Sequence, residues 1–378
     1  MFCLIFIIIH KKHKLTIKKR NLKVEKKLVI ETEITKMFGI KHPIFSAPMG
    51  PFYTAELAIA TSEAGGLGVL SATNMLSDIN AGVSATDKMM ELMQYVVEHT
   101  DKPFGFNIRT SRNEFDAATL VRKIPKFIMD NPKIKEQCLY AITSAGSSKT
   151  LPQSKTYQAL KESGSNIKHF HVAPALWLAD KCVASGVDGV VITGGEGGGH
   201  QSYEQVSSLV LLQQFTQKYP DFPVIACGGF ATGQGLAAAL NLGAGAIAMG
   251  SRFIASKESE FHETYKGIIP PAKAQDTILV TGVLGPIRLW RNNYSLHHGL
   301  VANKEEKMAE EGDGFDMETL LKIGKSYEMA YLGNVEDGAV LVGQSIGIIN
   351  SIEKVPDIID TIIKDAEKYI KKTAAYIK

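Results

Sequence analysis

The sequence has few cysteines and little excess charge. Its four cysteines, Cys3, Cys138, Cys182 and Cys227, lie far apart and form neither a CxxC pair nor a metal-ligand spacing. This scarcity indicates no metal site and favours a reducing compartment, which we take to be the cytoplasm. The formal net charge of +3 is small for 378 residues. Much of the basic excess lies in residues 11–27, so no nucleic-acid partner is indicated.

The sequence also lacks an apolar run long enough to cross a membrane as a helix, which takes about 20 residues. Met1–Ile9 is apolar but much shorter, and lysines follow it instead of preceding it as they do in a secretory signal. We therefore interpret residues 1–28 as a disordered basic extension and expect no membrane partner. A weak tether to a membrane surface is the alternative for this segment.

From Ile34 onward, short apolar runs alternate with helical stretches. Glycines directly follow several of the predicted helices, as expected for helix C-termini. Strands that alternate with helices imply a parallel sheet with right-handed crossovers. The eight runs are Pro43–Ala47, Leu67–Ser71, Phe104–Ile108, Leu139–Thr143, Ile167–Ala173, Gly189–Thr193, Pro223–Cys227 and Gly245–Met249.

Eight such units predict an α/β fold, a (β/α)8 TIM barrel, over residues 29–255. An open doubly wound sheet is the alternative, but the first strand is not followed by GxGxxG. Residues 256–300 read as irregular. We expect residues 256–378 to form a smaller, mainly helical lid subdomain, with helices at Asn303–Glu311, Met317–Ala330 and Val355–Lys378.

The sixth apolar run leads into the most unusual stretch, Gly194-Gly195-Glu196-Gly197-Gly198-Gly199-His200. Glycines let a backbone approach a ligand closely and adopt positive φ angles. A histidine just past the carboxyl end of a barrel strand lies where this fold keeps its chemistry. The alternative is a flexible loop with an incidental surface histidine.

Two other strand ends carry groups suited to a ligand. Ala47, Pro48, Met49 and Gly50 follow the first run, where a thioether and exposed backbone suit contact with a flat ring. An ordinary turn explains them equally well. Asn107 ends the third run, and its amide is either a ligand hydrogen-bonding group or a loop clamp.

The ends of the seventh and eighth runs predict a phosphate site. Gly228 and Gly229 follow the seventh run, and Gly250, Ser251 and Arg252 follow the eighth. In TIM barrels the loops after these two strands, together with a helix N-terminus, commonly bind phosphate through backbone N–H groups. Arg252 either contacts the phosphate or anchors the lid. A cofactor or substrate that carries phosphate is expected here.

The combination of motifs resembles the nitronate monooxygenase family, formerly called 2-nitropropane dioxygenases, to which flavin-type enoyl-ACP reductases are related. The resemblance covers residues from about 30 to 350. The motifs that carry it, in chain order, are Ala47-Pro48-Met49, Glu63-Ala64-Gly65-Gly66-Leu67-Gly68, Phe104-Gly105-Phe106-Asn107, Glu196-Gly197-Gly198-Gly199-His200, Gly228-Gly229-Phe230 and Met249-Gly250-Ser251-Arg252-Phe253.

This resemblance implies noncovalently bound FMN and oxidation of an alkyl nitronate with molecular oxygen to a carbonyl compound and nitrite. It gives His200 the catalytic role, as a proton-transfer group or as a cation beside the nitronate. The residues expected against FMN are Ala47, Pro48, Met49, Gly50, Asn107, Thr193, Gly198, Gly199, Gly228, Gly229, Gly250 and Ser251. Neither nucleic acid nor a membrane is an expected partner, and a homodimer is left open.

The chain departs from the family pattern at two positions. Many members carry Gln or Glu where this chain has Thr193, and Asp where it has Thr232. These changes leave FMN binding credible and put the substrate class in doubt. The alternative activity is an NAD(P)H-dependent flavin enoyl-ACP reductase or related oxidoreductase. A flavin-binding protein without turnover is the alternative from another class.

Overall fold

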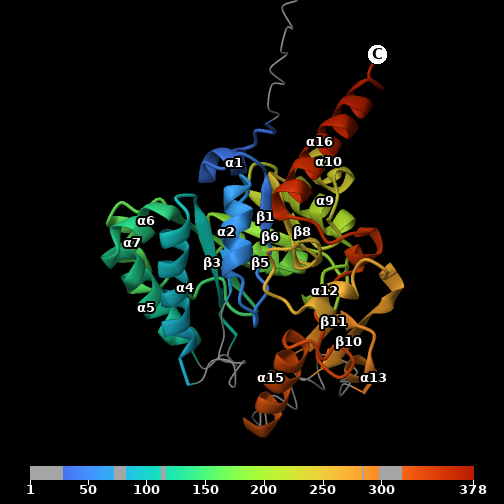
Figure 1. Cartoon of the computed structure of the whole chain (residues 1–378). Coiled ribbons are helices and arrows are strands. Elements are labelled where there is room, and N and C mark those ends of the chain that lie inside the picture. Colours follow the sequence, from blue (N-terminus) through green and yellow to red (C-terminus); the bar gives the residue numbers. More distant parts are fainter. Residues whose placement is uncertain (1–28, 72–81, 112–115, 283–284, 298–316) are drawn as a thin grey trace, which may run out of the picture.

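The computed structural model describes residues 29–71, 82–111, 116–282, 285–297 and 317–378. Eight parallel strands form one sheet in the order β1-β9-β8-β6-β5-β4-β3-β2, and a parallel bridge from Phe45 to Leu67 brings its edges together (Figure 1). The strands are β1 (Ile44–Ser46), β2 (Gly68–Leu70), β3 (Phe104–Arg109), β4 (Cys138–Ser144), β5 (Lys168–Ala173), β6 (Gly189–Thr193), β8 (Val224–Cys227) and β9 (Ala246–Met249). They coincide with the eight predicted runs, which confirms the TIM barrel and excludes the open sheet.

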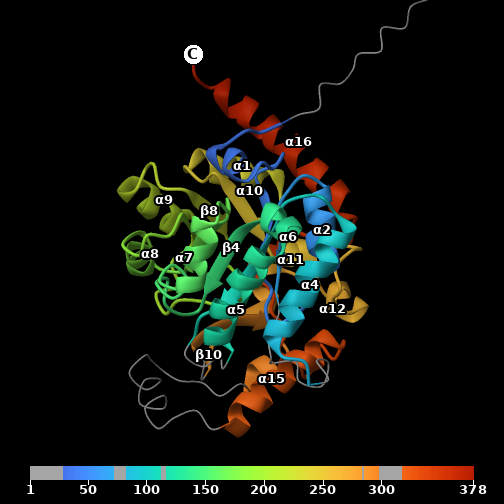
Figure 2. The same ribbon diagram turned by 90° about the vertical axis from the view of Figure 1, so that its left-hand side faces the viewer.

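Helices alternate with these strands and cover the outside of the barrel (Figures 1 and 2). Gly65, Gly186 and Gly243 lie just past helix ends with φ angles of 89°, 73° and 92°. Glycine adopts this left-handed region without steric cost, so the predicted stop signals are confirmed. The helices are α2 (Ala55–Glu63), α4 (Ala85–His99), α5 (Ala117–Asp130), α6 (Pro132–Gln137), α7 (Lys155–Glu162), α8 (Leu176–Val183), α9 (Ser208–Lys218) and α10 (Gly233–Asn241).

A short helix, α1 (Glu33–Phe38), closes the amino end of the barrel. Thr32 caps it through a reciprocal capping box with Thr35. Phe38, its last residue, packs edge-on against Phe45 and Tyr140, with ring centroids 5.6 and 5.4 Å apart. Because aromatic rings fill this end of the barrel, space for a ligand is left at the carboxyl ends of the strands.

The segment predicted to be irregular contains a β-hairpin. Strands β10 (Thr277–Gly282) and β11 (Gly285–Trp290) pair antiparallel, and β11 also pairs with β7 (Gly199–His200) from the glycine-rich loop. The hairpin is local and was missed, whereas the pairing of β7 with β11 joins segments about 85 residues apart in the chain, which no local pattern can show. The neighbouring elements are α11 (Ser251–Ile254), α12 (Glu263–Gly267), η1 (Ala274–Asp276), α13 (Asn293–His297) and η2 (Gln344–Ile348).

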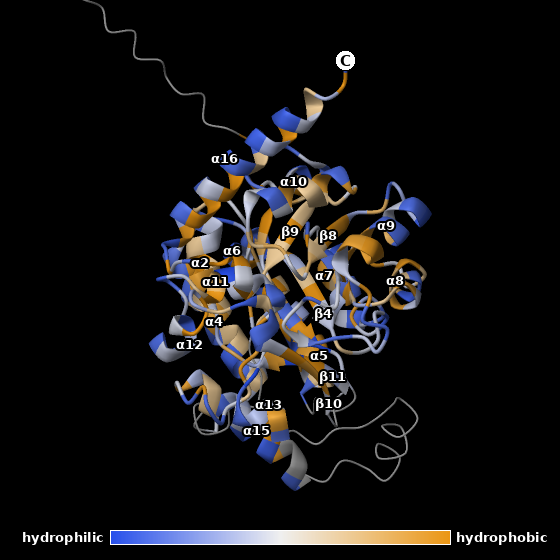
Figure 3. Cartoon of the chain, turned by 90° about the vertical axis from the view of Figure 1, so that its right-hand side faces the viewer, coloured by the Kyte–Doolittle hydropathy of each residue, from blue (hydrophilic) through white to orange (hydrophobic). Residues whose placement is uncertain are grey.

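The two long C-terminal helices lie at different ends of the molecule. Helix α15 (Met317–Tyr331) lies with the hairpin at the end opposite α1 (Figures 1 and 2). Helix α16 (Val355–Ala374) packs against α10 and α2 on the outside of the barrel, and hydrophobic and hydrophilic residues alternate along it (Figure 3). The predicted helix at Asn303–Glu311 lies outside the described residues. Among the described helices, none has both the length and the apolar character to cross a membrane.

Candidate functional site

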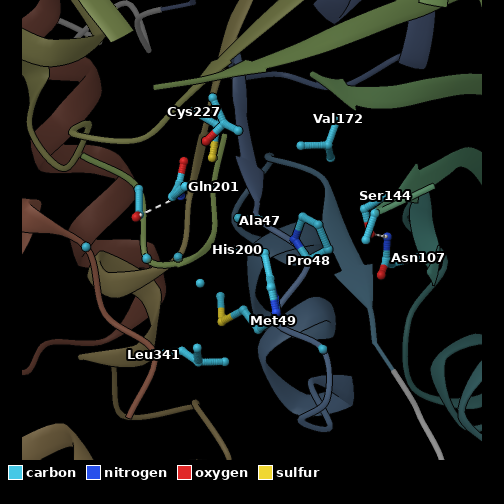
Figure 4. Close-up of a pocket in the computed structure, with 18 of the residues that line it drawn as sticks. Ala47, Pro48, Met49, Asn107, Ser144, Val172, His200, Gln201, Cys227 and Leu341 are labelled. Atoms are coloured by element: carbon cyan, nitrogen blue, oxygen red, sulfur yellow. Dashed lines mark hydrogen bonds between the residues drawn. The ribbon is translucent and has the colours of Figure 1, made fainter. Parts of the chain in front are cut away.

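A cavity of about 660 Å³ lies at the carboxyl ends of the barrel strands (Figure 4). This volume is in the range of sites for small molecules and cofactors. All of the residues predicted for the site line it. They are Ala47, Pro48, Met49, Gly50, Asn107, Thr193, Gly198, Gly199, His200, Gly228, Gly229, Gly250 and Ser251.

One wall of the cavity is the corner that follows β1. The Ala47 N–H donates to the Met249 carbonyl at 3.0 Å, and the Met49 N–H donates to Ser71 Oγ at 3.0 Å. These bonds tie the corner to both neighbouring strands, and Pro48 and Met49 face His200 across the cavity (Figure 4). The peptide bond between Gly50 and Pro51 is cis. The two backbone hydrogen bonds hold the corner in place between these strands.

Asn107 acts as a loop clamp. Its amide nitrogen donates to the Ile142 carbonyl at 3.2 Å and to Ser144 Oγ at 3.3 Å, and the residue is 5% exposed. These bonds hold the end of β4 against the end of β3. Of the two predicted roles, the clamp is present in the structure, and the amide still borders the cavity.

His200 is held by a strand, where the sequence suggested the end of a loop. It pairs with Ile287 of β11, and Gly199 pairs with Arg288. The Gln201 N–H donates to the Pro286 carbonyl at 2.8 Å, and Arg288 Nε donates to the Gly195 carbonyl at 2.8 Å. The backbone beneath the imidazole is thus fixed by the hairpin, and the side chain points into the cavity (Figure 4).

The glycines of this stretch serve packing more than ligand approach. A Cβ at Gly194 would lie 2.0 Å from Ser208 N, and a Cβ at Gly198 would lie 2.6 Å from the Val342 carbonyl carbon. Gly199 has a φ of 81°. Contacts within the protein therefore already require glycine at Gly194 and Gly198, and the left-handed backbone favours glycine at Gly199.

Glu196 ties the glycine-rich stretch to the loop after β8. Its carboxylate accepts from the Ser208 N–H at 2.8 Å, at the start of α9. Ser208 Oγ lies 2.9 Å from the same carboxylate and 2.6 Å from the Gly228 carbonyl oxygen. A carboxylate near a helix N-terminus is also favoured by the helix dipole. No sequence pattern predicts this link, because Glu196 stands among glycines and its partner Ser208 lies twelve residues further along the chain.

The loops after β8 and β9 have a different geometry from the Gly194–His200 stretch. A Cβ at Gly250 would meet nothing nearer than Ala47 Cβ at 4.0 Å, and one at Gly229 would first meet Glu196 Cβ at 3.6 Å. Within the described residues, the backbone N–H groups of Gly229, Phe230, Gly250 and Ser251 have no acceptor. Gly250 has an ordinary φ of −96°. Both loops therefore leave open space and available donors, which is the property of an anion cradle.

The two departures from the family pattern have structural roles. Thr193 is 6% exposed and its hydroxyl hydrogen-bonds the Cys227 thiol, whose pKa is raised by burial. Thr232 caps α10 by accepting from the Gly235 N–H at 3.2 Å.

Arg252 does not line the cavity; it donates to the Ala255 and Ser351 carbonyls at 2.7 and 2.6 Å. Of its two predicted roles, the anchor is therefore the one its contacts show.

Two histidines on β5 were not predicted. Thr143 Oγ1 lies 2.7 Å from His169 Nε2 and 2.6 Å from His171 Nδ1, and His171 borders the cavity. Burial lowers the pKa of His169 to about 3, helped by the nearby His171 and Lys161, and lowers that of His171 to about 4. Both imidazoles are therefore neutral at pH 7. Their spacing of two residues places them on one face of a strand, which was the available signal.

Gln201 was also missed. Its side-chain nitrogen donates to the Gly197 carbonyl at 2.8 Å, while its carbonyl oxygen is buried at the cavity with no partner in the described part of the chain. An unsatisfied buried acceptor in a cavity is a site that a donor on a ligand can satisfy.

Among the described residues, no group of three or more potential metal ligands is present.

Comparison with known proteins gives one family and several full-length relatives. A family model described as nitronate monooxygenase matches residues 31–365. The chain is 31% identical to (3aS,4S,5R,7aS)-5-hydroxy-7a-methyl-1-oxo-octahydro-1H-indene-4-carboxyl-CoA dehydrogenase of Rhodococcus jostii (strain RHA1), over 92% of this chain and 98% of that protein. It is 30% identical to a nitronate monooxygenase of Pseudomonas aeruginosa, over 66% of this chain and 77% of that protein.

Among solved structures, FabK from Thermotoga maritima is similar to this chain. It has 32% sequence identity and a TM-score of 0.73, and the match covers 92% of this chain and 100% of that one. A nitroalkane oxidase from Streptomyces ansochromogenes shares the fold at 22% identity and a TM-score of 0.69.

Proposed function

The chain belongs to the nitronate monooxygenase family, a family of oxidoreductases, and from this membership we propose that it is an FMN-dependent enzyme whose flavin lies in the cavity. In this proposal residues 29–255 bind the cofactor. The hairpin and α15, within residues 256–378, form the lid over its ring. The cradle at Gly229 and Gly250, where a Cβ would meet protein atoms no closer than 3.6 and 4.0 Å, supports a bound phosphate group.

The ring of FMN also fits the chemistry of the opposite part of the cavity. The buried carbonyl oxygen of Gln201 offers an acceptor for a ring N–H. Pro48 and Met49 offer apolar and polarizable surface for a flat aromatic system. The proposed FMN contacts are therefore the twelve residues named from the sequence, with Gln201 and the Phe230 N–H added.

The first candidate reaction is the oxidation of an alkyl nitronate with oxygen to a carbonyl compound and nitrite. FMN, when bound, supplies the electron-transfer chemistry. His200 acts on the substrate by holding or moving a proton at its imidazole, or by attracting the anionic nitronate as an imidazolium. The pairing of β7 with β11 fixes the position from which it acts.

One observation carries the proposal: a histidine held by a strand faces the same cavity as backbone N–H groups that have no acceptor among the described residues. We would test it by purifying the protein, releasing the chromophore by heat and identifying it. The holoenzyme would then be titrated with propane-2-nitronate without oxygen. Bleaching of the flavin by the nitronate is the expected result. Bleaching by NAD(P)H but not by the nitronate would contradict this reaction.

A second candidate is a flavin oxidoreductase of acyl thioesters, including the enoyl-ACP reductase type. It is favoured by the full-length match to a protein whose name is that of a carboxyl-CoA dehydrogenase. The same barrel, cradle and histidine serve both reactions. An acyl-CoA substrate, or NAD(P)H with an enoyl thioester, would then change the flavin spectrum while the nitronate would not. The cytoplasm is the setting that we propose for either activity, and the homodimer stays open.

A further inference from the structure

The cavity continues beyond the glycine loops into a region lined by apolar side chains, which we call the apolar arm. Its residues are Phe52, Ile254, Phe261, Leu321, Tyr327 and Leu341. The ring centroid of Phe52 lies 4.9 Å from that of Phe261 and 6.4 Å from that of Tyr327. These rings pack against one another, so the wall of the arm is a fixed surface.

Leu341 is held in place on the other side of the arm. Its N–H donates to the Tyr265 hydroxyl at 2.7 Å, and the Tyr265 hydroxyl donates to its carbonyl at 3.1 Å. Tyr265 itself is fully buried. With its backbone polar groups satisfied, Leu341 presents its side chain toward His200 and Met49 (Figure 4).

Helix α15 contributes one face to the arm. Leu321, Gly324 and Tyr327 all line the cavity, and residues three apart lie on the same side of a helix. Leu321 is 58% exposed and marks the outer end, whereas Tyr327 is 2% exposed and marks the inner end. The rise between them is about 9 Å, at 1.5 Å per residue.

Gly324 lies between these two residues and is buried. A glycine inside a helix is less favourable than an alanine. Because Gly324 lines the cavity, any larger side chain at this position starts from the wall of the arm.

We propose that the apolar arm binds an alkyl or alicyclic group of the substrate, and that Gly324 sets how large a group is admitted. This inference rests on the proposed function, because it places the reactive end of the substrate beside His200. Each methylene buried in such an arm is expected to tighten binding about fourfold.

The test measures binding without turnover. Anaerobic isothermal titration calorimetry of the holoenzyme would use straight-chain 1-nitroalkanes from nitropropane to nitrooctane. We expect the Kd to fall about fourfold with each added methylene. In the Gly324→Leu variant the decrease in Kd with chain length should stop at short chains, while the Kd for nitropropane stays unchanged. The Gly324→Ala variant should give Kd values between those of the parent enzyme and Gly324→Leu. It replaces Gly324→Leu in the test if that variant does not fold.

The control is Lys322→Leu, which adds the same side chain on the exposed side of the same helix. It should leave the whole series unchanged. A flat series in the parent enzyme, or an unchanged series in both Gly324 variants, would overturn the inference.

Failure of the proposed function would look different. If the Kd falls with chain length but nitronates do not bleach the flavin, the inference about the apolar arm is supported and the nitronate reaction is wrong. If the purified protein carries no flavin, the cofactor assignment is wrong whatever the calorimetry shows.

Discussion

Two walls of the cavity differ in how their polar groups are hydrogen-bonded. In the wall made by the Gly194–His200 stretch and the loops after β8 and β9, the N–H groups of Gly229, Phe230, Gly250 and Ser251 have no acceptor among the described residues. At the ends of β3 to β5, side chains bond one another instead: Thr143 lies between His169 and His171, and among the described residues only His169 Nδ1 of this group has no partner. Because available backbone N–H donors attract anions, the charged half of a ligand belongs at the first wall.

The glycine wall itself contains two kinds of glycine. At Gly194 and Gly198 a side chain is excluded, because protein atoms lie where its Cβ would be. At Gly250 the protein atoms leave room for a Cβ, so packing does not require glycine there. Sequences cannot distinguish these cases, since both read as glycine after a strand. The distinction decides which substitutions affect stability and which affect ligand binding.

The largest expected effect concerns the titratable group of the glycine wall. His200→Asn removes proton transfer and the imidazolium charge while keeping a polar side chain. We expect turnover to fall about 10²- to 10⁴-fold, as for loss of a general acid or base. The flavin content of the purified variant, read from its absorbance, should be unchanged.

His297→Asn is the matched control, because His297 lies exposed on α13 and its ring bonds the Asn293 carbonyl of the same helix. It should keep full turnover. Full turnover in His200→Asn would mean that the imidazole has no chemical role in the reaction.

The side-chain wall should make stability depend on pH. His169 and His171 have folded-state pKa values lowered to about 3 and about 4 from 6.5, chiefly by burial. Below pH 6.5 the unfolded chain therefore binds protons that the folded chain does not, and stability falls as pH falls. Each histidine contributes a slope of about 1.4 kcal/mol per pH unit until its folded pKa is reached.

Glu260 opposes this trend. Burial raises its pKa to about 7 from 4.5, so the folded chain binds the extra proton between pH 7 and 4.5 and stability rises there as pH falls. Urea unfolding at pH 6.5 and 4.5 would compare the parent protein with His169→Gln. The variant should lose less stability over this range, by about 3 kcal/mol for a fully buried histidine. Equal losses would mean that His169 is protonated or solvated in the folded protein.

A matched pair of alanine substitutions separates the two kinds of glycine. Gly198→Ala places a Cβ 2.6 Å from the Val342 carbonyl carbon, and overpacking of this kind costs about 1 to 3 kcal/mol. Gly250→Ala meets no protein atom within 3.9 Å, so apoprotein stability should hold. Its FMN affinity should fall about tenfold to a hundredfold if a phosphate occupies that space.

Thermal unfolding of the apoproteins and fluorescence titration with FMN would measure the two effects. Gly267→Ala is the control, since a Cβ there meets nothing within 4 Å and Gly267 ends α12 away from the cavity lining. If Gly250→Ala binds FMN normally, the cradle is not the phosphate site.

Much of the barrel and the cradle could be predicted because their signals are local. A buried parallel strand is a short apolar run, and a glycine loop after the seventh or eighth strand has a position fixed by the fold. The pairing of His200 with Ile287 could not be predicted, because it depends on register between distant segments. The Thr143 bridge between His169 and His171 needs the register of β4 against β5, which the sequence pattern does not contain.

The smallest effect that we expect concerns the link between the two glycine loops. Glu196→Gln keeps the size of the side chain but removes its charge, so one acceptor at the Ser208 N–H and the favourable interaction with the α9 dipole are weakened. A cost of about 1 kcal/mol in unfolding free energy follows, measurable as a shift in urea midpoint.

Glu136→Gln, at an exposed position of α6, is the control and should leave the unfolding free energy unchanged. Since Ser208 also contacts the Gly228 carbonyl, FMN affinity should fall together with stability in Glu196→Gln. A loss of stability with unchanged FMN affinity would show that the two loops are positioned independently of each other.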